Sequence, residues 1–172
     1  MNYGNIKYYD ISNGDGVRTS LFVSGCNHHC KGCFNEVAWD FDYGFPYTTE
    51  TTTEILDSLE PEYISGLSVL GGEPLDPRNV STVANLIYLT KLKYPEKTIW
   101  LYTGYTYEEI IQDLLFKDKY SYITILSSID VLVDGKFDES LKDISLKFRG
   151  SSNQRIIDIK KSQIADLVLM YD

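Results

Sequence analysis

The sequence predicts an α/β fold in which helices cover a parallel sheet that forms a partial βα barrel. Strand and helix patterns alternate along most of the chain, which is typical of parallel sheets. The chain has 172 residues, 43% of them hydrophobic, which suits one sizeable core. The four strand–helix units are too few to close an eight-stranded barrel, so one side should stay open. We expect a single domain over residues 1–172.

Apolar patterns and turn residues place the individual elements. Short apolar runs bounded by glycine turns predict strands, and apolar residues spaced by three or four positions predict helices. Asp76 and Pro77 are a helix cap and a first helical residue, and Pro95 ends that helix. The expected elements are strands at 18–24, 67–70, 98–103 and 129–134, helices at 53–59, 77–94 and 107–115, and, in the tail at 156–172, a packed helix that carries Ile164, Leu167 and Val168.

All three cysteines of the chain, Cys26, Cys30 and Cys33, lie within one short segment. An odd number of thiols cannot all pair as disulfides, and this spacing lets one loop direct three thiolates at one centre. Thiolates favour zinc or an iron–sulfur cluster. Because such centres take four ligands, three cysteines leave one position open for chemistry.

Two other interpretations of the cysteine segment are open at this point. The spacing also fits a buried helix face, but Gly25 and Gly32 bracket the run and polar residues separate the cysteines. His28 or His29 would complete a structural zinc site of three cysteines and one histidine. If neither histidine binds metal, we expect both to be solvated loop residues.

A second glycine motif, Gly71-Gly72-Glu73-Pro74, directly follows the expected strand at 67–70. Such a tetrapeptide alone is usually a turn. Two glycines at a strand end also allow the backbone to approach a ligand closely, and the glutamate offers a negative partner for an ammonium group. The motif is therefore a candidate binding element.

Thr103 and Asp134, each followed by glycine, come at the ends of two later strands. They are either ordinary turn residues or parts of the same site. Ligands of parallel α/β folds bind at the carboxyl ends of the strands. We therefore expect these two residues, the glycine motif and the cysteine segment to meet.

The sequence around the cysteines resembles the signature of radical S-adenosylmethionine enzymes that activate glycyl-radical enzymes. The resemblance implies that Cys26, Cys30 and Cys33 hold three irons of a 4Fe-4S cluster, and that S-adenosylmethionine chelates the fourth. It also implies a partial barrel of the radical S-adenosylmethionine type. Asp15 departs from the pattern, since relatives often carry proline there. The matching residues are Gly14, Gly16, Arg18, Phe22, Gly25, Cys26, Cys30, Cys33 and Asn35.

The same resemblance implies where S-adenosylmethionine would bind. The Gly-Gly-Glu-Pro motif is similar to the element that fixes the methionyl amino group in that family, and Phe34 would lie near the adenine. The cofactor contacts implied in this way are Gly32, Phe34, Gly71, Gly72, Glu73, Thr103 and Asp134.

Trp39 and the segments 100–105, 131–137 and 149–155 resemble one branch of the family, which activates anaerobic (class III) ribonucleoside-triphosphate reductase. That resemblance implies that a 5'-deoxyadenosyl radical takes hydrogen from a glycine of the large reductase subunit, with flavodoxin or a similar low-potential carrier as electron donor. The alternatives are an activase of another glycyl-radical enzyme, such as pyruvate formate-lyase, and a zinc-stabilised binding module.

Composition limits the setting of the protein. A formal net charge of -9 argues against a nucleic-acid partner, because the phosphates would be repelled. The sequence has neither an apolar run of membrane-spanning length nor an apparent signal segment, so we expect a cytoplasmic protein with reduced thiols.

Overall fold

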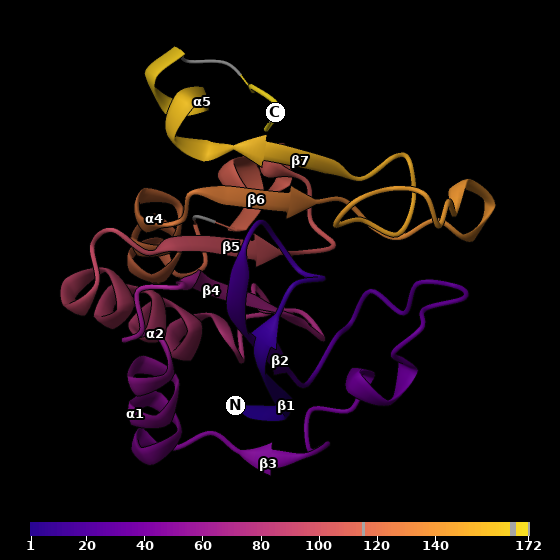
Figure 1. Cartoon of the computed structure of the whole chain (residues 1–172). Helices are drawn as coiled ribbons and strands as arrows, with labels where there is room; N and C mark the ends of the chain where they lie inside the picture. The colour runs from indigo at the N-terminus through magenta and orange to yellow at the C-terminus, as the bar shows by residue number, and fades with distance from the viewer. Residues whose placement is uncertain (115, 166–167, 172) are drawn as a thin grey trace.

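The computed structural model describes residues 1–114, 116–165 and 168–171, and within these ranges seven strands form one sheet. In chain order they are β1 (Asn2–Asp10), β2 (Val17–Val23), β3 (Phe45–Pro46), β4 (Ile64–Gly71), β5 (Thr98–Tyr102), β6 (Val131–Asp134) and β7 (Arg155–Asp158). The spatial order is β3-β1-β2-β4-β5-β6-β7. The four central strands β2, β4, β5 and β6 run parallel, and the outer strands are antiparallel to their neighbours. The sheet is open, with β3 and β7 as its edges (Figure 1).

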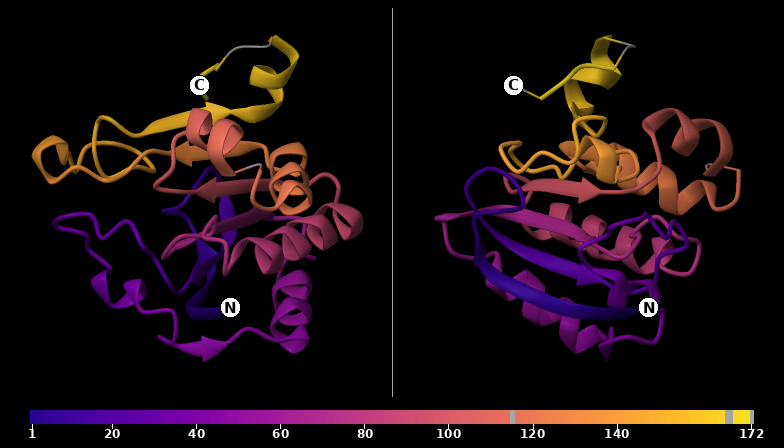
Figure 2. Two further views of the ribbon diagram at one scale, coloured as in Figure 1. Left: turned by 180° about the vertical axis from the view of Figure 1, so that it is seen from behind. Right: turned by 90° about the vertical axis from the view of Figure 1, so that its right-hand side faces the viewer.

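Helices α1, α2 and α4 lie together on one side of this sheet (Figures 1 and 2). Thr48 caps α1 by accepting a hydrogen bond from the backbone of Thr51, and Asp118 caps α4 in the same way. In the described part of the chain, no helix is long and apolar enough to cross a membrane. The helices are α1 (Thr49–Ser58), α2 (Val80–Lys93), α3 (Tyr107–Glu109), α4 (Lys119–Ser128) and α5 (Ile159–Ala165), and the short turns are η1 (Glu36–Trp39), the π-helical η2 (Ile110–Leu114) and η3 (Glu139–Leu141).

The main hydrophobic core lies between the sheet and these helices. Because successive side chains of a strand point to opposite faces, every second strand residue enters this core. Each fully buried aliphatic side chain contributes about 1.5–3 kcal/mol relative to exposure. The buried cluster includes Leu21, Val23, Leu67, Val69, Ile99, Leu101 and Leu132 from the strands, and Ile55, Val83, Leu86, Ile87 and Ile125 from the helices.

The opposite face of the central strands is polar and aromatic. Arg18 on β2 is fully buried there and donates to the hydroxyl of Ser68 and to the main-chain carbonyls of Leu67 and Thr98. Its guanidinium also lies over the ring of Trp100, 5.7 Å from the centroid. Burial lowers the pKa of Arg18 to about 10. This one side chain ties β2, β4 and β5 together.

The predicted α/β class is confirmed, and so are the four parallel strands, within a few residues at their ends. The antiparallel strands β1, β3 and β7 are additions that the sequence analysis missed. β1 alternates poorly because tyrosines and charged residues mix along it, and β3 has only two residues. The sheet is therefore mixed rather than purely parallel.

The helices differ more from the prediction. α1 begins at Thr49, not at residue 53, because Thr48 is its cap. α2 begins at Val80, after Asn79, so Asp76 and Pro77 lie in the turn before the helix rather than at its cap and first position. The helix expected at 107–115 is a short α-helix that widens into η2, and residue 115 lies outside the described residues. α4 was not predicted, since its isoleucines, tyrosines and serines are weak helix formers. In the tail, α5 includes Ile164, Val168 lies beyond the helix, and Leu167 lies outside the described residues.

Candidate functional site

One cavity lies at the carboxyl ends of the parallel strands, where the loops after β2, β4, β5 and β6 meet. The cysteine loop (residues 26–35) follows β2, and the Gly-Gly-Glu-Pro turn (residues 71–74) begins at the end of β4. The cavity has a volume of about 150 Å³ and is partly open to solvent. The predicted residues that line it are Cys26, Cys30, Cys33, Phe34, Gly71, Gly72, Glu73 and Thr103.

Main-chain hydrogen bonds to η1 fix the base of the cysteine loop. The N–H of Gly25 donates to the carbonyl of Ala38 at 2.8 Å, and that of Cys26 donates to the carbonyl of Trp39 at 3.1 Å. Gly25 has a φ of 92°, and a Cβ there would overlap the ring of Phe41. Glycine thus lets the chain turn sharply out of β2 and places the first cysteine at the cavity.

The three thiols have different surroundings. Burial raises the pKa of the Cys26 thiol to about 11, and the backbone N–H groups of the two following histidines act in the opposite direction. Burial also raises the pKa of Cys30. The N–H of Asn35 donates to Sγ of Cys33 at 3.4 Å. N–H groups directed at sulfur favour the thiolate, which is the form that binds metal.

Glu73 lies at the back of the cavity with only 1% of its surface exposed. Its Oε1 accepts hydrogen bonds from the N–H of Leu75 at 2.9 Å and from the hydroxyl of Thr103 at 2.8 Å. Its Oε2 contacts the N–H of Gly104 and Nε2 of His28, both at 2.8 Å. A carboxylate has about four lone-pair positions, so these four groups occupy all of them.

The expectation that both histidines are solvated is wrong for His28. The His28 side chain is 8% exposed, and its ring stands edge-on to Tyr105 with 4.5 Å between centroids. His29 is exposed and stacks on Trp39, with 4.6 Å between centroids. Two adjacent histidines between two cysteines give no periodic pattern, so the burial of His28 against Glu73 could not be read from the local sequence.

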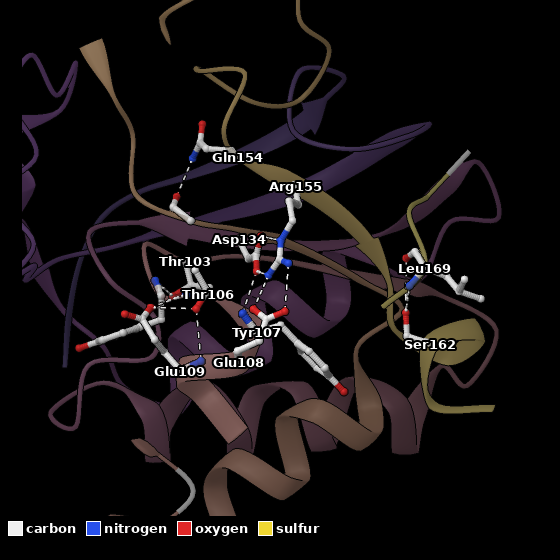
Figure 3. Close-up of polar contacts among 12 residues, drawn as sticks. Thr103, Thr106, Tyr107, Glu108, Glu109, Asp134, Gln154, Arg155, Ser162 and Leu169 are labelled. Carbon is white, nitrogen blue, oxygen red and sulfur yellow. Dashed lines mark hydrogen bonds and ion pairs between the residues drawn. The ribbon is translucent and has the colours of Figure 1, made fainter. Parts of the chain in front are cut away.

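Gly32 and Asp134, the other two predicted contacts, are not among the residues that line the cavity. Gly32 has a φ of 72° and lies beside the side chain of Glu139. Asp134 is fully buried, and its carboxylate accepts hydrogen bonds from the guanidinium of Arg155 and from the N–H of Tyr107 (Figure 3). Asp134 supports the loops around the cavity rather than facing into it.

Further lining residues were not singled out from the sequence, among them Tyr102 and Gln154. Tyr102 ends β5, and only its strand-end position hinted at the site. Nε2 of Gln154 donates to the carbonyl of Gly135 at 3.0 Å (Figure 3), and its Oε1 accepts from the N–H groups of Gly150 and Ser151. Gln154 thereby closes the long loop between β6 and β7 beside the cavity.

Comparison with known proteins identifies the kind of chain that carries this cavity. Residues 12–157 match the family model of a 4Fe-4S single cluster domain. The chain is 43% identical over 160 residues to the anaerobic ribonucleoside-triphosphate reductase-activating protein of Pasteurella multocida, covering 91% of this chain and 96% of the relative. The proteins of the same name from Enterobacteria phage T4 and Escherichia coli K12 are each 41% identical over 156 residues, covering 91% and 90% of this chain and 93% and 96% of the relatives. The chain belongs to this family of activating proteins.

The cysteine loop of this activating-protein family member fits an iron–sulfur cluster better than a closed zinc site. Within the described ranges, no three Cys, His, Asp or Glu side chains are grouped so as to hold a metal ion. The three thiols nevertheless line one cavity, while His28 contacts Glu73 and His29 stacks on Trp39. The match to a 4Fe-4S single cluster domain therefore favours an iron–sulfur cluster over zinc, with the three thiolates as its candidate ligands.

Proposed function

We propose that this chain cleaves S-adenosylmethionine reductively at a 4Fe-4S cluster and installs a glycyl radical on anaerobic ribonucleoside-triphosphate reductase. The observation that carries the proposal is the single cavity that three cysteine thiols share with the Gly-Gly-Glu-Pro turn. We take the reductase as the partner because the relatives are named as its activating proteins. The open sheet supports a partial barrel of the radical S-adenosylmethionine type, within a single domain over residues 1–172.

Cys26, Cys30 and Cys33 would hold three irons and leave the fourth for the amino and carboxylate groups of S-adenosylmethionine. When bound, the reduced cluster supplies the electron that splits S-adenosylmethionine into methionine and a 5'-deoxyadenosyl radical, which abstracts hydrogen from a reductase glycine. The remaining tasks, namely binding, orientation and water exclusion, belong to the chain. Glycines at positions 71 and 72 let the main chain approach the methionyl end of the ligand.

Of the other predicted contacts, Phe34 would meet the ligand directly, whereas the rest would act through other residues. Phe34 is 91% exposed although it lines the cavity, so a ligand or the reductase could cover its ring and exclude water from the radical. Thr103 would act through Glu73, to which its hydroxyl donates. Gly32 and Asp134 would shape the loops from behind the cavity.

The proposed setting is the cytoplasm, where thiols stay reduced and low-potential carriers such as flavodoxin can supply electrons. The net charge of -9 suits a protein partner better than a nucleic acid.

The decisive experiment mixes the anaerobically reconstituted chain with the reductase, S-adenosylmethionine and a reductant. Electron paramagnetic resonance should show a glycine-centred doublet that disappears when the reductase glycine is replaced by alanine or S-adenosylmethionine is omitted. A doublet on pyruvate formate-lyase but not on the reductase would favour the alternative partner. A colourless protein with one zinc per chain would refute the cluster.

A further inference from the structure

His28 connects the two elements between which S-adenosylmethionine would have to lie. It belongs to the cysteine loop, between Cys26 and Cys30, and its Nε2 contacts Oε2 of Glu73 in the Gly-Gly-Glu-Pro turn at 2.8 Å. Both side chains are almost fully buried, at 8% and 1% exposure. A buried hydrogen bond to a carboxylate is stronger than an exposed one, so this contact holds the loop against the turn.

The surroundings of His28 are built to receive an imidazole. Its ring packs edge-on against Tyr105, and a Cβ on Gly104 would come within 2.4 Å of its Cδ2. Only glycine at position 104 leaves room for the ring while also donating its own N–H to Glu73. The imidazole therefore fills a place formed by the loop that follows β5.

A second side chain of the cysteine loop is anchored on the segment after the same turn. Nδ2 of Asn27 donates to Oδ2 of Asp76 at 2.7 Å, and Arg78 lies against both residues. Both carboxylates are buried, but Asn27 is an exposed residue, whereas the His28 side chain is only 8% exposed. His28 is thus the more buried of the two links.

We propose that His28 is a positioning residue that fixes the Glu73 carboxylate and sets the spacing between the cysteine loop and the Gly-Gly-Glu-Pro turn. The inference rests on the proposed function, because the ligand would be held by iron on one side of that spacing and by the turn on the other. The four contacts of Glu73 leave its carboxylate no free position, so its part in binding is to hold the turn in shape. Loss of the histidine would leave Glu73 with its other three donors but would remove the buried contact between the cysteine loop and the turn, so the spacing of the two elements would change.

The test compares His28→Ala, His28→Gln and His29→Ala in the reconstituted protein. The Kd for S-adenosylmethionine is measured by calorimetry, together with iron content and steady-state cleavage. Loss of one buried hydrogen bond to a charged group typically changes an equilibrium constant by about 10–100-fold. We expect His28→Ala to raise Kd and KM about 10-fold or more, with iron content kept and kcat changed by less than about 3-fold.

Two variants make the comparison specific. The glutamine amide can reach Glu73 with an N–H, so His28→Gln should restore most of the affinity. His29 is in the same loop but stacks on Trp39 outside the cavity, so His29→Ala should bind as the wild type does. If His28→Ala does not fold, His28→Leu keeps apolar volume against Tyr105 without a donor and takes its place.

A normal Kd in His28→Ala or His28→Leu would overturn the inference, as would a loss of affinity that glutamine fails to restore. Loss of iron with normal ligand affinity in the loaded fraction would also overturn it, because His28 would then serve the cysteine loop alone. These outcomes are distinct from failure of the proposed function. In that case the wild-type protein itself would bind no cluster or no S-adenosylmethionine.

Discussion

The guanidinium of Arg155, the first residue of β7, donates hydrogen bonds to the carboxylate of Asp134, the last residue of β6. Its Nε lies 3.0 Å from Oδ1 of Asp134, and the same guanidinium donates to Glu108 at the start of α3 (Figure 3). The hydrogen bonds of Arg155 raise its pKa, with the larger contribution from Asp134 and the smaller from Glu108. Because Gly135 follows directly and lines the cavity, this contact fixes the antiparallel edge strand beside the candidate site.

Replacing Arg155 with lysine should therefore destabilise the fold near the cavity. Lysine keeps the charge but loses the planar fork that contacts Asp134 and Glu108 together, which should lower the free energy of unfolding by about 1–3 kcal/mol. Urea denaturation measures the change. Glu108→Gln is the control, because Glu108 is half exposed and its loss should cost about 1 kcal/mol or less. Equal effects of the two variants would contradict a special role for Asp134.

Single replacement of Cys26, Cys30 or Cys33 by alanine should abolish the cluster. The three thiols line one cavity, and the chain has no fourth cysteine that could replace a lost thiolate. Anaerobic reconstitution of the wild type should give a brown protein with about four irons per chain, and each variant should be bleached. Iron analysis and the visible spectrum measure this. Full iron content in any one of the three variants would exclude that cysteine as a ligand.

The parallel half of the fold could be predicted because its signals are local. Each central strand is an apolar run that ends at a glycine turn, and those turns carry the cysteines, Gly71 and Thr103. The carboxyl-end rule for parallel strands then brings them together without further information. α4 could not be predicted in the same way, because its isoleucine, tyrosine and serine residues favour a helix only when packed against α2 and the sheet.

The site shows the same division between local and distant information. The cysteine spacing is contiguous in the sequence and indicates its chemistry directly. The places of His28 and Asp134 depend on partners far along the chain, Glu73 and Arg155, which no local pattern connects to them. Sequence reasoning could therefore single out the cysteines as candidate ligands, but it could not place the side chains of His28 and Asp134.

The pH dependence of stability should include a contribution from Asp10, at the end of β1. Burial alone would raise its pKa, but hydrogen bonds from Ser20, Asn13, Lys7 and the N–H of Ser12 outweigh burial and lower the pKa to about 2. A carboxylate with a lowered pKa stabilises the folded state above its unfolded value of 3.8, and this stabilisation is lost as the pH falls through about 2.

We therefore expect Asp10→Asn to be less stable than the wild type by about 1–3 kcal/mol at pH 7. The difference should shrink between pH 4 and pH 2, because the wild-type carboxylate becomes protonated there. Urea denaturation at several pH values measures the gap, and Asp113→Asn, at an exposed position, serves as the control. A gap that stays constant down to pH 2 would show that the charge of Asp10 contributes nothing.

Gly72 should be needed for the conformation of the cysteine loop as well as for the close approach of a ligand. A Cβ at this position would lie 2.5 Å from the carbonyl oxygen of Gly25 and 3.0 Å from that of Ala38, both at the base of the loop. Gly72→Ala should therefore reduce iron content together with S-adenosylmethionine binding. Thr103→Val removes a hydroxyl that contacts Glu73 but does not affect the backbone at Gly25 and Ala38, so this variant should keep its iron. Full iron content in Gly72→Ala would show that the backbone at Gly25 and Ala38 can move aside without loss of the cluster.

The tail should be held across the polar and aromatic face of the sheet by Tyr171. Its hydroxyl donates to Asp15 at 2.7 Å, and its ring stands edge-on to Trp100 with 5.1 Å between centroids. This contact joins a segment beyond residue 157, where the family match ends, to the turn before β2. Glycines at positions 14 and 16 are packed tightly in that turn, with Trp100 and Ser65 where side chains would begin.

Tyr171→Phe should loosen the tail without unfolding the protein, because it removes one hydrogen bond, worth about 0.5–1.5 kcal/mol, and keeps the ring on Trp100. The expected result is faster tryptic cleavage after Lys160 or Lys161 in α5, with an unchanged urea midpoint for the rest of the chain. Asp15→Ala removes the acceptor and should have a similar effect, and the double variant should cleave no faster than either single one, since both remove the same contact. Tyr120→Phe, at an exposed position in α4, is the matched control. Additive effects of Tyr171→Phe and Asp15→Ala would mean that the two side chains hold the tail independently.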